Sequence, residues 1–242
     1  ADLRDADLND ARLAGANLRR ADLRGANFSG VSLKKVKLAG ARASELRVLP
    51  QKVPKAWRCY PHKGGKGVLL GPGVDLSGVD LSGADLHGAR LDGADLTAAN
   101  LADAKLDGVD LRGAKLQGAN LRGASAVGAD LRDAAGEDVD FGGADLTMAN
   151  LEGASITGNF EGAVLNSSRM RFTTQQPWRG VIRLRSEDPD EASVDLVCCG
   201  PPPISVLLDG GPSGEDVSFG TAASDSRGIP KIHAGPIPHA FF

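Results

Sequence analysis

The chain repeats itself every five residues, and this period constrains the fold more than any other feature. From Ala1 the sequence reads ADLRD ADLND ARLAG ANLRR, and from Val74 it reads VDLSG VDLSG ADLHG ARLDG. With the large apolar residue as position i, all seventeen repeats of residues 74–158 carry Ala or Val at i−2, and fifteen carry Leu, Ile or Phe at i. Position i−1 is polar in all but one repeat, and twelve have Gly at i+2.

A period of five matches neither the helical period of 3.6 nor the strand period of 2. It fits a short strand with i−2 and i facing inward and i−1 facing outward, followed by a corner at i+1 and i+2. Glycine suits the corner, because it adopts positive φ without steric cost. One such unit cannot bury its own apolar side, so the repeats must stack on one another as a solenoid.

The pattern A-(D/N)-L-x-x, over residues 1–43 and 74–158, resembles the pentapeptide-repeat family. The resemblance implies an all-β fold, a right-handed quadrilateral β-helix with four repeats per coil. At a strand spacing of ~4.8 Å, we expect about six coils. The family includes bacterial proteins that protect DNA gyrase from quinolones or natural toxins.

Two repeats lack the large apolar residue, since Ala126 and Gly136 stand at i. We expect the ring of Phe141 to fill the space beside Gly136. After Ile156 the pattern slips by one residue and continues at Phe160, which predicts that the solenoid ends or kinks there.

Residues 44–73 interrupt the repeat, and their prolines and glycines favour irregular backbone. We expect a long loop that leaves the rod and returns to it, and loops of this length are usually functional or disordered. Trp57 and Tyr60 lie among basic residues such as Arg58, an arrangement that can grip single-stranded nucleic acid. The favoured interpretation is that Trp57 anchors the loop and the lysines keep it in water, so direct nucleic-acid binding is not expected.

The last segment, residues 171–242, holds nine of the thirteen prolines. Candidate strands are Val181–Arg185, Ser193–Cys198 and Ile204–Leu208, separated by turn residues. We expect a small β-rich cap or tail. The chain therefore divides into coils at 1–43, a basic loop at 44–73, coils at 74–170 and this C-terminal segment.

No residue set in the sequence suggests catalysis, a cofactor or a metal. Gly64-Gly65-Lys66-Gly67 lacks the spacing of a phosphate-binding loop. Cys59 and His62 make at most half of a metal site. The aspartates follow from the repeat, whose i−1 position points outward. With three cysteines and no apolar run long enough to cross a bilayer, we expect a cytoplasmic protein that is not an enzyme.

Charge is distributed unevenly along the chain, with +9 over residues 1–73 and −9 over residues 74–160. A DNA mimic four coils long would need about twelve negative charges, because B-DNA carries one per ~1.7 Å. The acidic half approaches this number but spreads its charge over all four faces. The candidate partner-binding residues are Trp57, Arg58, Tyr60, Asp75, Asp95, Asp110, Asp130, Asp133, Glu137 and Asp138.

Two functions remain open from the sequence. The first is a non-enzymatic interaction module that presents flat faces and a loop to a protein partner, with a topoisomerase protected by DNA mimicry as the specific version. The second is a structural or targeting spacer of a larger bacterial protein, which the start inside a repeat at Ala1 favours. The sequence leaves the oligomeric state open, a dimer included.

Overall fold

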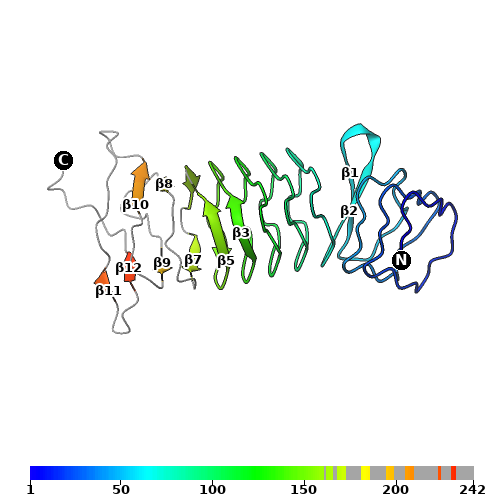
Figure 1. Cartoon of the computed structure of the whole chain (residues 1–242), viewed down its shortest axis with the longest axis horizontal. Coiled ribbons are helices and arrows are strands. Elements are labelled where there is room, and N and C mark those ends of the chain that lie inside the picture. Colours follow the sequence, from blue (N-terminus) through cyan, green and yellow to red (C-terminus); the bar gives the residue numbers. More distant parts are fainter. Residues whose placement is uncertain are drawn as a thin grey trace.

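The chain forms a rod of stacked coils, seen from the side in Figure 1. The computed structural model describes residues 1–160, 162–165 and 168–172, together with five later strands. From residue 169 onward it describes the course of the backbone alone, and the side chain of Lys63 is also outside the description. The remaining positions of the C-terminal segment, including His233 and His239, lie outside the described residues.

Most sides of the coils are single parallel bridges, and the longer strands lie at the hairpin and toward the C-terminus. They are β1 (Arg58–Pro61), β2 (Gly67–Leu70), β3 (Ala135–Asp140), β4 (Asn150–Leu151), β5 (Ser155–Asn159), β6 (Ala163–Val164), β7 (Arg169–Phe172), β8 (Val181–Arg185), β9 (Asp195–Cys198), β10 (Ser205–Asp209), β11 (Ala223–Ser224) and β12 (Pro230–Ile232). One short 3-10 turn, Lys63–Gly65, joins β1 to β2.

The coils stack with a register of twenty residues. Asp75 bridges Asp95 in parallel, and Asn100 bridges Asn120. The backbone N–H of Leu86 donates to the carbonyl of Lys105, 2.8 Å away. Four five-residue repeats therefore complete one coil, which confirms the four-sided β-helix expected from the sequence.

The interior holds the apolar positions of the repeat. Leu86, Leu106 and Leu146 are 1%, 0% and 0% exposed, and the Ala and Val residues at i−2 are buried beside them. The predicted inward column of large apolar side chains is confirmed. A small residue at i−2 leaves room for the Leu of the same side, so the narrow interior fills without aromatic residues.

The corner position i+2 takes the left-handed conformation. Every i+2 residue from Gly78 to Gly153 has positive φ, and the five that are not glycine lie between 54° and 58°. Three of these five are Asp, which tolerates this region better than most residues. The remaining two are Ala98 and Met148.

Val139 lies beside Gly136, in addition to the buried ring of Phe141. A Cβ on Gly136 would lie 2.7 Å from the carbonyl carbon of Leu116 and 2.9 Å from a methyl group of Val139. The register of β3 against β5 shifts between Gly136 and Val139. This bulge brings Val139 to Gly136, and Phe141 stacks on Phe160 with the ring centroids 4.7 Å apart.

The frame shift after Ile156 shortens one coil without ending the solenoid. Asp145 bridges Val164, nineteen residues on, and Phe160 is fully buried. Parallel pairing then continues from β4 to β7 and β9, and from β6 to β8 and β10. The expectation that the rod ends at the slip is therefore wrong. Strand β8 has the predicted bounds, and β9 and β10 lie at the other two predicted strands.

Residues 44–73 are more regular than expected. Val48 bridges Asn27 and Lys52 bridges Ser32, so the coil continues to about residue 53. The chain then forms the antiparallel hairpin β1–β2, in which Cys59 lies opposite Leu69. The apolar run at residues 67–70 forms the buried strand β2 and is not part of an irregular loop.

The hairpin wedges between two successive coils. On one side of the rod Arg42 still bridges Asp75 directly, whereas on the next side Leu46 bridges Gly67 of β2 instead. In Figure 1 the first coils are turned relative to the later ones, and the hairpin stands out from the rod where the direction changes. No helix of the described chain could cross a membrane.

The corner conformation generates a stability prediction. Gly93→Ala should lower the free energy of unfolding by about 1 kcal/mol, because an L-residue resists the left-handed region. Ala98→Gly should leave it unchanged or raise it by up to about 1 kcal/mol, since the greater freedom of glycine in the unfolded chain offsets part of the relief. Urea denaturation of both variants measures the difference. An equal loss in both would contradict the role assigned to the corner.

Candidate interaction surfaces

Trp57 anchors the hairpin. Its side chain is only 9% exposed, and a Cβ on Gly71 would lie 2.2 Å from its indole ring. The ring therefore packs directly on the backbone of Gly71, which only glycine permits at this distance. Of the two roles considered for Trp57, the structure places it as an internal anchor and not as an exposed contact residue.

Arg58 and Tyr60 join β1 to the coil that follows it. Nη1 of Arg58 donates to the carbonyl oxygen of His87 at 3.0 Å. The backbone N–H of Asp85 donates to the Tyr60 hydroxyl oxygen at 3.3 Å. Arg58 remains exposed, so it supplies a positive charge on the outer surface of the hairpin.

Cys59 is a partly buried residue of the hairpin. Its Sγ lies 3.7 Å from the carbonyl oxygen of Pro50 as a weak donor, and burial raises the pKa of its thiol. Among the described residues, no three His, Cys, Asp or Glu side chains are grouped so that they could hold a metal ion. Cys59 lies in strand β1, and His62 directly follows this strand at the turn of the hairpin.

A cleft of about 550 Å³ lies between the hairpin tip and the coils beside it. Arg42 and Asp75 line it together with Glu45 and Lys66. Arg42 pairs with Asp75 at 3.4 Å, and Lys66 pairs with Glu45 at 3.0 Å. Because these charges compensate one another, the cleft shows no preference for an anion or a cation.

The four sides of the rod are numbered in chain order from the repeat that contains Asp2, which stacks through Asp22 and Arg42 on Asp75. Asp75 and Asp95 occupy one column on this first side. The Ser77 hydroxyl donates to Asp75 at 2.7 Å, in addition to the Arg42 contact. Asp95 lies 3.5 Å from Nζ of Lys115. Burial alone would raise the pKa of Asp95, but hydrogen bonds from Thr97 and the Lys115 charge lower it overall. Both candidate carboxylates are thus already partnered.

Asp110 and Asp130 belong to an ionic ladder on the fourth side. Arg112 reaches Asp110 at 2.7 Å and Asp130 at 3.7 Å, and Arg132 reaches Asp130 at 2.6 Å. The side-chain hydrogen bonds from these arginines hold the pKa of both carboxyl groups below its usual value. The ladder neutralises most of the negative charge of this side.

Asp133, Glu137 and Asp138 differ from the other candidates. All three are exposed, and within the described part of the chain none of them forms an ion pair. Asp133 lies at the corner between the fourth side and the first, and Glu137 and Asp138 lie at the next corner, between the first side and the second. We name these three residues the acidic corner. The sequence identified them but could not separate them from the neutralised aspartates.

These features define a class of protein before any comparison is made. The chain is a repeat scaffold whose flat sides present outward polar columns and whose regularity is broken by the hairpin β1–β2. The family profile described as pentapeptide repeats (8 copies) matches residues 1–40, 75–113, 94–133 and 114–153. The chain belongs to the pentapeptide repeat family, whose members are in general binding scaffolds and not enzymes.

Solved structures of similar proteins come from varied sources. HetL, involved in heterocyst differentiation regulation in the cyanobacterium Nostoc, is 27% identical, with 70% of this chain and 81% of HetL covered and a TM-score of 0.24. The Nostoc pentapeptide repeat protein alr5209 is 30% identical, with 40% and 72% covered and a TM-score of 0.21. QnrB1, a plasmid-mediated fluoroquinolone resistance protein, is 20% identical, with 76% and 80% covered and a TM-score of 0.28. A comparison with curated protein sequences gives no match.

The ionic ladder generates a prediction about pH. Because Arg112 depresses the pKa of Asp110 in the folded state, the pair stabilises the fold above the unfolded pKa of about 3.9 and loses this contribution as pH falls through the folded pKa. Arg112→Gln should move the Asp110 pKa up toward its usual value, measured by the carboxyl carbon shift in NMR. It should also reduce the stability lost between pH 7 and pH 3 by a small amount, because the pair is exposed to solvent.

Arg122→Gln is the matched control, because Arg122 contacts Asp140 at 3.5 Å and lies outside the ladder. It should leave the Asp110 pKa unchanged. An Asp110 pKa that is the same in wild type and Arg112→Gln would contradict the ladder.

Proposed function

We propose that the chain is a non-enzymatic interaction module that contacts a protein partner through the acidic corner and the hairpin. The observation that carries the proposal is that Asp133, Glu137 and Asp138 are exposed and outside the ion pairs that neutralise the other candidates. Charged groups fixed on a regular backbone favour a partner of opposite charge and set the orientation of docking. A cationic protein surface is therefore the expected complement.

The hairpin supports the same proposal by its position. It is joined to the rod through Trp57, Arg58 and Tyr60, so it is held in place and not free to reorient. It also projects from the side of the rod (Figure 1). A projection held in this way limits the orientations in which a partner can approach.

The specific version of this function is protection of DNA gyrase by mimicry of DNA. The acidic half of the rod carries −9, close to the roughly twelve charges of a comparable length of duplex. The ladder reduces the charge that a partner would meet on the fourth side. Mimicry would therefore depend on the acidic corner more than on Asp110 and Asp130.

A structural or targeting spacer is the second candidate. The ionic ladder favours it, because charges that satisfy one another across coils stabilise a rod without recognising anything outside it. The length of the native gene distinguishes the two functions. A product near this size favours the protector, whereas a long multidomain product favours the spacer.

A gyrase supercoiling assay in the presence of a quinolone tests the specific version. The wild-type chain should restore supercoiling, and the triple variant Asp133→Asn, Glu137→Gln, Asp138→Asn should lose at least most of this protection. Asn is chosen for Asp133 and Asp138 because both have positive φ, which Asn tolerates. The control Asp5→Asn, Asp7→Asn, Asp10→Asn removes the same charge from the first coil and should still protect.

If the wild-type chain neither protects nor alters supercoiling without the drug, the gyrase version is wrong. If the control variant loses protection as fully as the acidic-corner variant, then the site assignment is wrong while the function stands. Circular dichroism of all variants excludes loss of fold as the cause.

A further inference from the structure

The first coils separate charge around their circumference. Residues 11–20, 31–40 and 51–57 contain eight Lys or Arg and no Asp or Glu. All six acidic residues of the first 57 positions fall in the intervening segments 1–10, 21–30 and 41–50. We name the first set the basic surface, which consists of Arg12, Arg19, Arg20, Lys34, Lys35, Lys37, Lys52 and Lys55.

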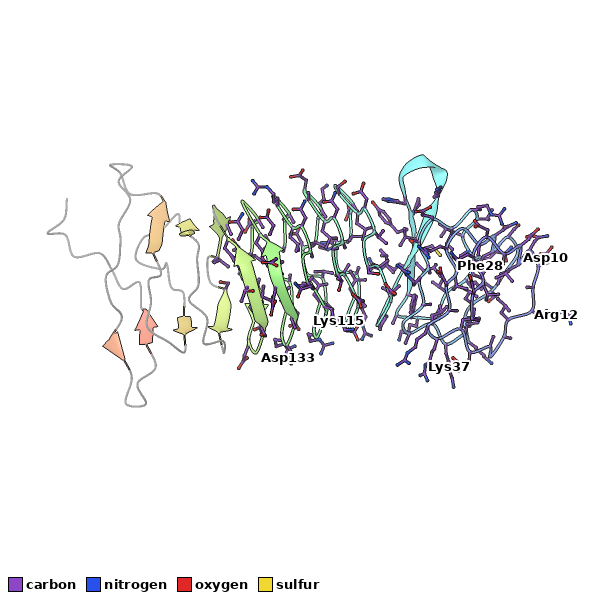
Figure 2. The ribbon with its side chains drawn as sticks, viewed as in Figure 1. Asp10, Arg12, Phe28, Lys37, Lys115 and Asp133 are labelled. Atoms are coloured by element: carbon purple, nitrogen blue, oxygen red, sulfur yellow. The ribbon has the colours of Figure 1, made fainter. Side chains whose placement is uncertain are left out.

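The register of the coils brings these residues to one flank of the rod. Asn17 bridges Lys37, and Ser32 bridges Lys52. The N–H of Leu33 donates to the carbonyl of Lys52 at 2.8 Å. The three segments therefore lie one above another and cover the third and fourth sides with their corners. In Figure 2 Arg12 and Lys37 both point away from the body of the rod.

The cations of the basic surface have no internal counter-charges. All eight are exposed, and within the described part of the chain none forms an ion pair. The opposite flank behaves differently, since Arg4 pairs with Asp2 at 2.7 Å and Arg24 with Asp22 at 2.6 Å. The opposite flank therefore carries acidic and basic side chains together, whereas the basic surface presents an uncompensated positive field.

We infer that the basic surface binds the phosphate backbone of double-stranded nucleic acid. A duplex carries eight phosphate charges in about 14 Å of its length. Three stacked coils at ~4.8 Å each cover a similar length. Trp57 is the one aromatic residue of these three segments and is buried, so the surface offers charge without an exposed stacking platform for unpaired bases.

Other polyanions fit the surface less well. Its large apolar side chains at i, such as Leu33 and Leu38, are buried, so the surface has nothing to insert into a lipid bilayer. Among the described residues, a second copy of the chain carries its exposed carboxylates without ion pairs at scattered positions, such as Asp103 and Glu152 besides the acidic corner, and not in one evenly spaced row. A duplex is the occupant that supplies enough evenly spaced negative charge.

The expected contact is independent of base sequence, because phosphates carry no sequence information. It is also distinct from the acidic corner and the hairpin. The sequence alone does not predict it, because the net charge of residues 1–73 says nothing about its distribution around the rod. Only the twenty-residue register separates the two flanks.

Fluorescence anisotropy with a labelled 20-base-pair duplex of arbitrary sequence tests the inference on the full chain. At about 100 mM salt we expect micromolar binding, within the usual range for non-specific contacts. Between 50 and 200 mM salt, the logarithm of the association constant should fall with the logarithm of the salt concentration with a slope of about −4 to −7, for five to eight phosphates neutralised. A single strand of equal length should bind no more tightly.

The variant Lys34→Gln, Lys35→Gln, Lys37→Gln, Lys52→Gln should weaken duplex binding at least tenfold and reduce the slope by about 3 to 4. The matched control Arg90→Gln, Arg112→Gln, Lys115→Gln, Arg132→Gln removes the same number of positive charges from ion pairs in the acidic half. The duplex affinity of the control should stay within about threefold of the wild-type value, and its salt slope should stay within about one unit.

Three outcomes would overturn the inference. The first is no duplex binding by wild type at 50 mM salt, and the second is an equal loss in both variants. The third is binding to phosphatidylserine vesicles or self-association in sedimentation, with no binding to the duplex. Circular dichroism of both variants verifies that each keeps the β-helix. Since gyrase assays contain DNA, the Lys→Gln variant also separates this surface from protection by the acidic corner.

Discussion

The structure depends on the backbone hydrogen bonds that join each side of a coil to the same side of the next coil, in a register of twenty residues. The N–H of Leu96 donates to Lys115 at 2.8 Å and the N–H of Leu116 donates to Ala135 at 2.7 Å, and comparable bonds occur on the other sides. A coil satisfies its backbone only by stacking on its neighbours. The same stacking buries one Leu per side, worth about 1.5–3 kcal/mol each. The stability of each coil therefore depends on its neighbours and does not require aromatic side chains.

Outward-facing side chains stack with the same twenty-residue register and form columns along the rod. Asn120 donates to Asn100 at 3.1 Å, and Asn100 donates to Asp80 at 3.0 Å. Arg112 likewise bridges two aspartates on successive coils. The column that a charged side chain occupies, and not its distance along the sequence, therefore decides which other charges lie next to it. The neutralised ladder, the acidic corner and the basic surface are three results of one geometric rule.

The sequence predicted the features that depend only on residues within one repeat. Inward Leu106 and the corner glycines follow from a motif of five residues, and the twenty-residue coil was implied by the resemblance to the family. The hairpin was harder to predict, because β1 and β2 pair with each other and wedge between coils, so their apolar residues follow no five-residue spacing. The bulge at Val139 was missed for a related reason, since it depends on how β3 adjusts to β5.

The candidate site was predicted as a set of residues but not as an arrangement. Asp110 stands at i−1 of its repeat and Asp133 at i+2, but only the structure shows that Arg112 neutralises the first and that nothing described pairs with the second. Trp57 was selected as an aromatic among basic residues, and its burial against Gly71 is a long-range contact. The segregation of Lys34 and Lys52 from the acidic residues appears only when the chain is wound with the correct period.

Disulfide trapping tests the register most directly. In a chain with Cys59, Cys198 and Cys199 replaced by Ser, the pair Asn100→Cys and Asn120→Cys should form a disulfide on mild oxidation, because these residues bridge in parallel with their side chains in contact. The pair Asn100→Cys and Ser125→Cys, on different sides, should stay reduced, as measured by thiol titration and mass spectrometry. Bond formation in the second pair and not in the first would contradict the twenty-residue coil and all that follows from it.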